Sequence, residues 1–265
     1  MQAYNKTDQQ LHWLCQTIAK ANRTFVPAKP DDSHTNLYFD ALGNRIVGHW
    51  IESGNEKIML TLNLESLNFE WLNSAKKVLQ SVTTLGKRAS TYESELEQQL
   101  PALKLKPQGF IDALHFQIPE YSFAKEAIER IDVTNLNEWK SYRKLANNLS
   151  ATVLGYLQIE GDIRIWPHHF DTGIYVEVDK KIGLGFGLAM QDEMAGAPYF
   201  YLSGYALQGS VEYQKLPKFE KGRWEIGKHW QGAILPLIEL SSVHEENQFA
   251  TDDFLLKSTN WFLSQ

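Results

Sequence analysis

Hydrophobic residues recur at helical spacing in several stretches of the chain. Near the N-terminus, apolar side chains fall at positions i, i+3, i+4 and i+7, which predicts an amphipathic helix over about residues 7–21, capped by Thr7 or Asp8. A longer stripe predicts a central helix over 136–157 with Thr134 or Asn135 as its cap, and shorter patterns predict helices over 90–100 and 247–263. The inward stripe of the central helix consists of Leu136, Trp139, Tyr142, Leu145, Leu149, Val153 and Leu157.

Between these helices, apolar and polar residues alternate with a period of two, which is typical of strands with one buried face. Turn-forming clusters separate the runs, so we expect antiparallel meanders. The fold class predicted is α+β, with antiparallel β-sheets and helices at the N-terminus, in the centre and at the C-terminus. We expect residues 1–265 to form a single compact domain, with a diverged duplication of 1–130 and 131–265 as the alternative. The predicted strands cover 36–39, 45–52, 57–63, 67–72 and 77–85, and then 163–166, 170–178, 182–190, 198–207 and 232–240.

Three glycines alternate along one of these strands. Gly183, Gly185 and Gly187 remove every side chain from one face of the run, which weakens a strand unless another group needs the space. We therefore expect a close approach of another element or a ligand there. No helix start follows, so the spacing is a poor match to a dinucleotide-binding loop.

Composition narrows the class of protein without naming a function. The 26 basic and 32 acidic residues give a net charge of -6, which argues against general binding to nucleic acid or to anionic membranes. The longest uncharged apolar run, Gly232 to Ile238, is far shorter than the roughly 20 residues of a membrane helix. A single cysteine, Cys15, and the lack of a visible secretory signal favour the cytoplasm. The oligomeric state stays open.

Two segments are dense in imidazole and carboxylate groups. If the chain stays extended between the strands at 163–166 and 170–178, neighbouring His168 and His169 face opposite sides, whereas His169 and Asp171 share a face about 6–7 Å apart. That pair could act as a general base with its carboxylate, could bind a divalent metal, or could only satisfy a half-buried histidine. The loop with Asp31, Asp32 and His34 could complete the same pocket, although such clusters are often plain turn chemistry.

Aromatic residues gather in the second half and include Trp166, Tyr199 and Tyr201. Such rings stack on sugars, bases or cations, but in a half-buried sheet they are also ordinary core and edge residues.

The order of motifs resembles a family of uncharacterised bacterial proteins. The resemblance covers nearly the whole chain and rests on the DDSHTN loop at 31–36, WPHHFD at 166–171, GLGFG at 183–187, PYFY at 198–201 and WQGA at 230–233. Members of that family often have Ser-Pro-Gly-Asp where this chain has Ala189-Met-Gln-Asp192, so only Asp192 corresponds there. The resemblance implies an architecture and a site location, and it implies no activity.

Two functions follow as hypotheses, and a structural or self-associating role through exposed strand edges stays open as a third. One is a hydrolase-like enzyme, either metal-dependent or using acid–base chemistry, with His168, His169 and Asp171 as its catalytic groups. Asp31, Asp32, His34, Trp166, Asp192, Tyr199 and Tyr201 would then contact its ligand. The alternative is a non-catalytic module that binds a small molecule on an aromatic-lined sheet. The sequence leaves the presence of a metal and the identity of any ligand open.

Overall fold

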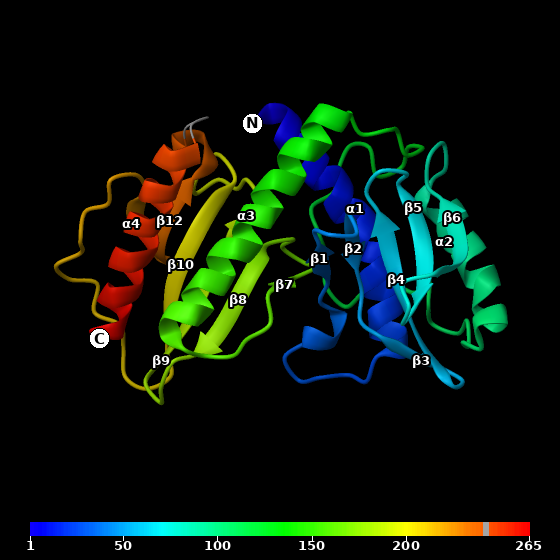
Figure 1. Ribbon diagram of the computed structural model, residues 1–265, viewed down its shortest axis with the longest axis horizontal. Helices are drawn as coiled ribbons and strands as arrows, with labels where there is room; N and C mark the ends of the chain where they lie inside the picture. Colours follow the sequence, from blue (N-terminus) through cyan, green and yellow to red (C-terminus); the bar gives the residue numbers. More distant parts are fainter. Residues whose placement is uncertain (241–243) are drawn as a thin grey trace. The chain divides into compact units, whose positions relative to one another are not determined.

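The computed structural model describes residues 1–240 and 244–265. Within them the chain forms four α-helices and two antiparallel six-stranded sheets (Figure 1). The α+β class predicted from the periodicity is confirmed. The helices are α1 (Gln2–Phe25), α2 (Ala89–Gln99), α3 (Val133–Leu157) and α4 (His244–Leu263).

The first sheet has the strand order β1-β2-β4-β5-β6, with β3 paired to β4. The second has the order β11-β12-β10-β9-β8-β7. Each strand predicted from the alternation has a counterpart, and β11 was not predicted. The bounds are β1 (Tyr38–Asp40), β2 (Arg45–Val47), β3 (Ile51–Ser53), β4 (Glu56–Asn63), β5 (Asn68–Asn73), β6 (Val78–Thr83), β7 (Arg164–Ile165), β8 (Thr172–Glu177), β9 (Ile182–Ala189), β10 (Tyr199–Ala206), β11 (Arg223–Ile226) and β12 (Gln231–Pro236).

The chain divides into two compact units, which we describe separately. The N-terminal unit comprises residues 6–141 and 164–170, and the C-terminal unit comprises residues 1–5 and 142–163 with the described part of 171–265. The division falls inside α1 and inside α3. A single domain over 1–265 and a diverged duplication both stay predictions.

In the N-terminal unit, α1 is held by a buried amide. Asn22 is fully buried, donates to the Asn36 carbonyl at 2.9 Å and accepts from the His49 N–H at 3.0 Å. A buried amide with both ends paired stabilises the loops that flank β1. The expected cap of this helix was wrong, because α1 begins at Gln2 and both Thr7 and Asp8 lie buried inside it.

The central helix begins at Val133, three residues before its predicted start at residue 136. The Asp132 carboxylate accepts hydrogen bonds from the N–H groups of Thr134 and Asn135, so Asp132 caps α3 in place of those two residues. The stripe prediction is confirmed for Leu136, Trp139 and Leu149, which are buried, whereas Leu145 is only half-buried.

In the C-terminal unit, α3 and α4 lie over one face of the sheet (Figure 1). The Phe262 ring of α4 fills the space beside Gly204 on β10, where an added Cβ would lie 2.4 Å from it. The opposite face carries the glycines of β9, and tyrosine side chains from the neighbouring strands fold over them. An added Cβ would lie 2.6 Å from the Tyr175 hydroxyl at Gly183, 3.1 Å from the Tyr205 ring at Gly185 and 2.9 Å from the Tyr201 hydroxyl at Gly187. The close approach expected at these three positions is confirmed.

Among the described helices, none combines the length and the apolar character that crossing a membrane would require.

Candidate functional site

The segment Trp166–Asp171 is a turn, and the expectation of a strand there was wrong. Residues 167–169 form the turn, the Trp166 carbonyl accepts from the Phe170 N–H at 2.6 Å, and Phe170 has a φ of 57°. The opposite-face assignment of His168 and His169 therefore fails, since their rings lie 4.4 Å apart. Pro167 fixes its own φ and lacks an N–H, which favours a turn over a continued strand.

Two side chains of α1 anchor this turn in the N-terminal unit. The Pro167 carbonyl lies 2.8 Å from His12 Nε2 and accepts from the Gln16 amide, also at 2.8 Å. A carbonyl only accepts, so His12 Nε2 donates to it, and Nδ1 is hydrogen-bonded to the Tyr121 hydroxyl at 2.7 Å. Burial raises the pKa of Tyr121, which keeps its hydroxyl a donor. The His12 ring also stacks on Phe170 with the centroids 5.1 Å apart, so the turn is rigidly held.

The loop with Asp31, Asp32 and His34 lies in the same unit. Its exit is fixed by two backbone hydrogen bonds between Leu37 and Ile165, of 2.9 and 2.7 Å, so it leads directly beside the strand that precedes the turn. The Ser33 hydroxyl and backbone N–H, and to a lesser extent Arg164, hold the pKa of Asp31 below its usual value. His34 is buried, and its Nδ1 accepts from the Lys29 N–H at 3.2 Å. This imidazole therefore stabilises the loop, and the turn-chemistry interpretation is supported by Asp31, whose Oδ1 accepts from the Ser33 N–H at 3.2 Å.

Asp32 pairs with a histidine that the sequence did not single out. His115 Nε2 lies 2.5 Å from Asp32 Oδ2, and both side chains are about half exposed. The adjacent Phe116 ring lies 5.6 Å from the His168 ring. The loop and the turn are thus linked through His115 and Phe116, which belong to an irregular segment over residues 104–132. Long segments of this kind in compact units are often functional.

A cleft with a volume of about 250 Å³ opens next to these groups. Gln16 and Phe116 line it, and each also contacts the turn, which places the cleft beside the residues predicted from sequence. Its walls are mostly aromatic and aliphatic, with a single ion pair at one side. The lining residues are Trp13, Gln16, Lys20, Ala89, Tyr92, Glu93, Ala113, Leu114, Phe116 and Ile118.

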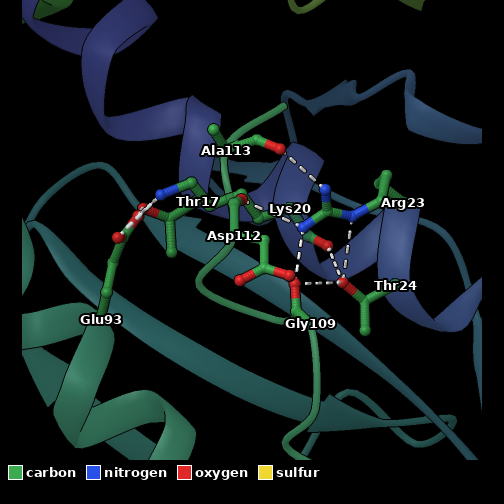
Figure 2. Close-up of polar contacts among 8 residues, drawn as sticks. All are labelled: Thr17, Lys20, Arg23, Thr24, Glu93, Gly109, Asp112 and Ala113. Atoms are coloured by element: carbon green, nitrogen blue, oxygen red, sulfur yellow. Dashed lines mark hydrogen bonds and ion pairs between the residues drawn. The ribbon is translucent and has the colours of Figure 1, made fainter. Parts of the chain in front are cut away.

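The ion pair of the cleft joins α1 to α2 (Figure 2). Lys20 Nζ donates to both carboxylate oxygens of Glu93, at 2.9 and 2.8 Å, and the Thr17 hydroxyl donates to Oε1 at 2.9 Å. Both charged side chains are largely buried, with 17% and 12% exposed. Burial and the neighbouring Glu93 charge raise the pKa of Tyr92, so that its hydroxyl stays neutral in the cleft wall.

Arg23 holds one wall of the cleft in place. Its guanidinium donates to the carbonyls of Gly109, Asp112 and Ala113 at 2.7, 3.1 and 3.0 Å (Figure 2). Ala113 itself and Leu114, the next residue along the chain, line the cleft. Three carbonyls converging on one guanidinium fix the path of an otherwise irregular backbone.

The remaining predicted residues belong to the C-terminal unit. The Tyr199 hydroxyl donates to Asp192 at 2.7 Å, and the Tyr201 hydroxyl donates to Asp171 at 2.6 Å. The pKa values of both tyrosines are raised, first by burial and then by these carboxylates. These four residues therefore form tyrosine–carboxylate pairs on the glycine face of the sheet, and Asp171 and His169 lie in different units.

Within the described residues, no group of three or more His, Cys, Asp or Glu side chains is arranged to hold a metal ion. The comparisons give no further guide, because no family model, curated protein or solved structure significantly matches the chain.

Proposed function

We propose that the protein binds a small molecule in the cleft of the N-terminal unit. The observation that carries this proposal is an aromatic-walled cavity of about 250 Å³ with one largely buried Lys20–Glu93 pair in its lining. Ligand sites are mostly apolar concavities with a few fixed polar groups, and their volumes begin at about 300 Å³. The cleft lies just below the lower end of that range and so suits a compact ligand. This supports the small-ligand alternative, with the cleft as the place of the ligand.

The polar groups of the cleft favour a neutral ring that carries a hydroxyl group. Lys20 uses two of its three protons on Glu93, so one remains for a ligand oxygen. Both amide protons of Gln16 bind carbonyls, which leaves its Oε1 as an acceptor for a hydroxyl proton. Because Glu93 already neutralises Lys20, an anionic ligand would have to compete with the Glu93 carboxylate for that lysine and would lie close to the carboxylate charge. The rings of Trp13, Tyr92 and Phe116 supply the apolar contact.

Ligand-observed NMR with phenol and benzoate tests this selectivity. We expect phenol to bind and benzoate to bind about tenfold more weakly, which corresponds to about 1.4 kcal/mol. The Glu93→Gln variant removes the repelling charge and should bring benzoate up to the affinity of phenol. Glu97→Gln, on the same helix but outside the lining, is the control and should leave both affinities unchanged. Binding of neither probe to the wild-type protein would contradict the proposal.

Acid–base chemistry at the rim of the cleft is the second candidate. The observation in its favour is the Asp32–His115 hydrogen bond, because a carboxylate that orients a half-exposed imidazole is the arrangement of a general base. Phe116 connects this pair to the cleft. Hydrolysis of 4-nitrophenyl acetate by the wild-type protein should fall strongly in His115→Ala and stay unchanged in His229→Ala, an exposed histidine of the other unit. Equal rates in the two variants would exclude this role.

Membership of the bacterial family with the WPHHFD motif is likewise a proposal, supported by the order of motifs along the chain.

A further inference from the structure

A second cavity lies in the C-terminal unit, on the glycine face of the sheet. It has a volume of about 470 Å³ and is formed by the end of β10, the segment that follows it, and the turn between β11 and β12. It contains none of the residues of the N-terminal cleft. Its lining comprises Ser203, Gly204, Tyr205, Ala206, Gly209, Ser210, Val211, Tyr213, Lys228, His229, Trp230 and Gln231.

Glycines on the strands beside Ser203 make room for two aromatic rings. On β9, Gly185 pairs with Ser203, and the Tyr205 ring folds over it. On β12, an added Cβ at Gly232 would lie 2.7 Å from the Trp230 ring, so Trp230 lies over that glycine. Leu202 pairs with Ala233, which places Gly232 beside Ser203 on the same face. Both rings therefore flank one serine.

The serine between these rings has an unused hydroxyl. Ser203 is 2% exposed, and among the described residues its Oγ has no hydrogen-bond partner. Leaving a buried hydroxyl unpaired is unfavourable, so such a group in a cavity lining marks a place for a polar ligand atom. Serine is also a small residue that either donates or accepts, which suits a polar ring substituent.

A lysine and a histidine stand at the rim of the same cavity. Lys228 and His229 are exposed residues of the four-residue turn between β11 and β12, directly before Trp230. A lysine at the rim binds a phosphate as a point charge, and the aromatic residues below it offer stacking faces to a base. Tyr205 is 46% exposed, so its ring is accessible.

We propose that this cavity binds a nucleoside monophosphate, or a ring anion of that size, with the base against Trp230 and Tyr205, a polar atom on Ser203 and the phosphate at Lys228. The proposal is independent of the ligand in the N-terminal cleft. The cavity volume lies within the range of about 300–1,000 Å³ that is usual for small-molecule sites.

Calorimetric titration of the full chain with AMP, adenosine and inorganic phosphate tests the proposal. We expect saturable binding of AMP with a Kd at or below about 1 mM, and binding of adenosine about tenfold weaker, since it lacks the charge. Inorganic phosphate alone should bind more weakly than adenosine, because it has no base to stack on the Trp230 and Tyr205 rings.

Three variants locate the site. Lys228→Gln should weaken the binding of AMP by about tenfold and leave the binding of adenosine unchanged. Ser203→Val should weaken the binding of both AMP and adenosine, because it removes the hydroxyl and adds methyl groups at the base of the cavity. Lys144→Gln, on an exposed position of α3, is the charge-matched control and should bind AMP like the wild type. Unfolding curves check that each variant is folded. The proposal is overturned if AMP, GMP and UMP all fail to bind, or if folded Lys228→Gln and Ser203→Val bind AMP like the wild type.

Discussion

Glycine positions in the C-terminal unit differ sharply in what surrounds them. At Gly173 on β8, an added Cβ would lie 2.1 Å from the Phe186 carbonyl oxygen and 2.6 Å from the Gly187 Cα. At Gly155 in α3, nothing lies within 4 Å of an added Cβ. The first glycine is required by close backbone packing, whereas the second is a helix position where glycine only adds flexibility to the unfolded chain.

Replacing these two glycines should therefore change stability in opposite directions. We expect Gly173→Ala to lower the free energy of unfolding by about 1–3 kcal/mol, because the sheet must shift to admit the methyl group. Gly155→Ala should raise it by about 0.5–1 kcal/mol through helix propensity. Urea unfolding measures both. A neutral Gly173→Ala would show that the strands can separate at no cost.

The pattern of residue types along the chain predicted where backbone and side chains pack closely, but it did not predict which side chains form hydrogen bonds with one another. The alternating glycines of β9 correctly indicated a close approach, because a missing Cβ is a local property of the sequence. The partner of Asp32 could not be found in this way, since His115 lies 83 positions away in a segment without periodicity. The four glycine-face residues Asp171, Asp192, Tyr199 and Tyr201 were named as site residues, yet their mutual pairing depends on strand register, which the sequence does not show.

Among the helices, α3 is fixed by a residue that is both packed and hydrogen-bonded. Trp139 is fully buried, and its indole N–H donates to Asp8 Oδ1 at 2.7 Å. Trp139→Ala should lower the free energy of unfolding by about 3–5 kcal/mol, as for other large-to-small core changes. Leu145→Ala, on the same helix and half-buried, should cost clearly less. Similar losses for both variants, measured in urea, would contradict the assigned packing.

The segment around residues 109–113 owes its path to α1. Because the Arg23 guanidinium binds three of its carbonyls, we expect Arg23→Gln to speed hydrogen–deuterium exchange over 106–118 without affecting β4 or β5. Lys6→Gln, at an exposed position of α1, is the control and should leave exchange unchanged. If exchange over 106–118 is the same in both variants, the arginine does not hold the cleft wall.

At the scale of elements, periodicity predicted helices and strands well and predicted loops poorly. The central helix and both meanders could be predicted because apolar residues recur in the sequence about every 3.6 residues along a helix and every 2 residues along a strand. Extended backbone was assumed at 167–169 when His168 and His169 were assigned to opposite faces, whereas Pro167 and the contacts from His12 and Gln16 decide the conformation of this turn. Those contacts come from residues 151 or more positions away, and no local pattern reports them.

Across the whole molecule, buried tyrosines set the alkaline limit of stability. Burial raises the pKa values of Tyr92, Tyr199 and Tyr201, and it raises that of Tyr213 to about 12. The unfolded chain ionises these phenols at about pH 10, so their contribution is fully present below that pH and is lost as the pH rises toward the folded-state values.

We therefore expect the urea midpoint to be insensitive to tyrosine ionisation up to about pH 9 and to fall steadily above about pH 10. Tyr201→Phe should flatten that decline, since it removes one of the ionising groups. Tyr156→Phe, at an exposed position, is the control and should leave the slope unchanged. A decline with the wild-type slope in Tyr201→Phe would contradict the assignment.

Filling the N-terminal cleft tests the proposed function most directly. Ala113 lines the cleft and is exposed, so Ala113→Trp should occupy the cavity without disturbing the core, and Ala75→Trp, in the exposed turn between β5 and β6, is its control. Ligand-observed NMR with phenol should show binding to the wild type and to Ala75→Trp, and no binding to Ala113→Trp. AMP binding should be equal in all three proteins. Unchanged phenol binding in Ala113→Trp would contradict the assignment of the cleft as the ligand site.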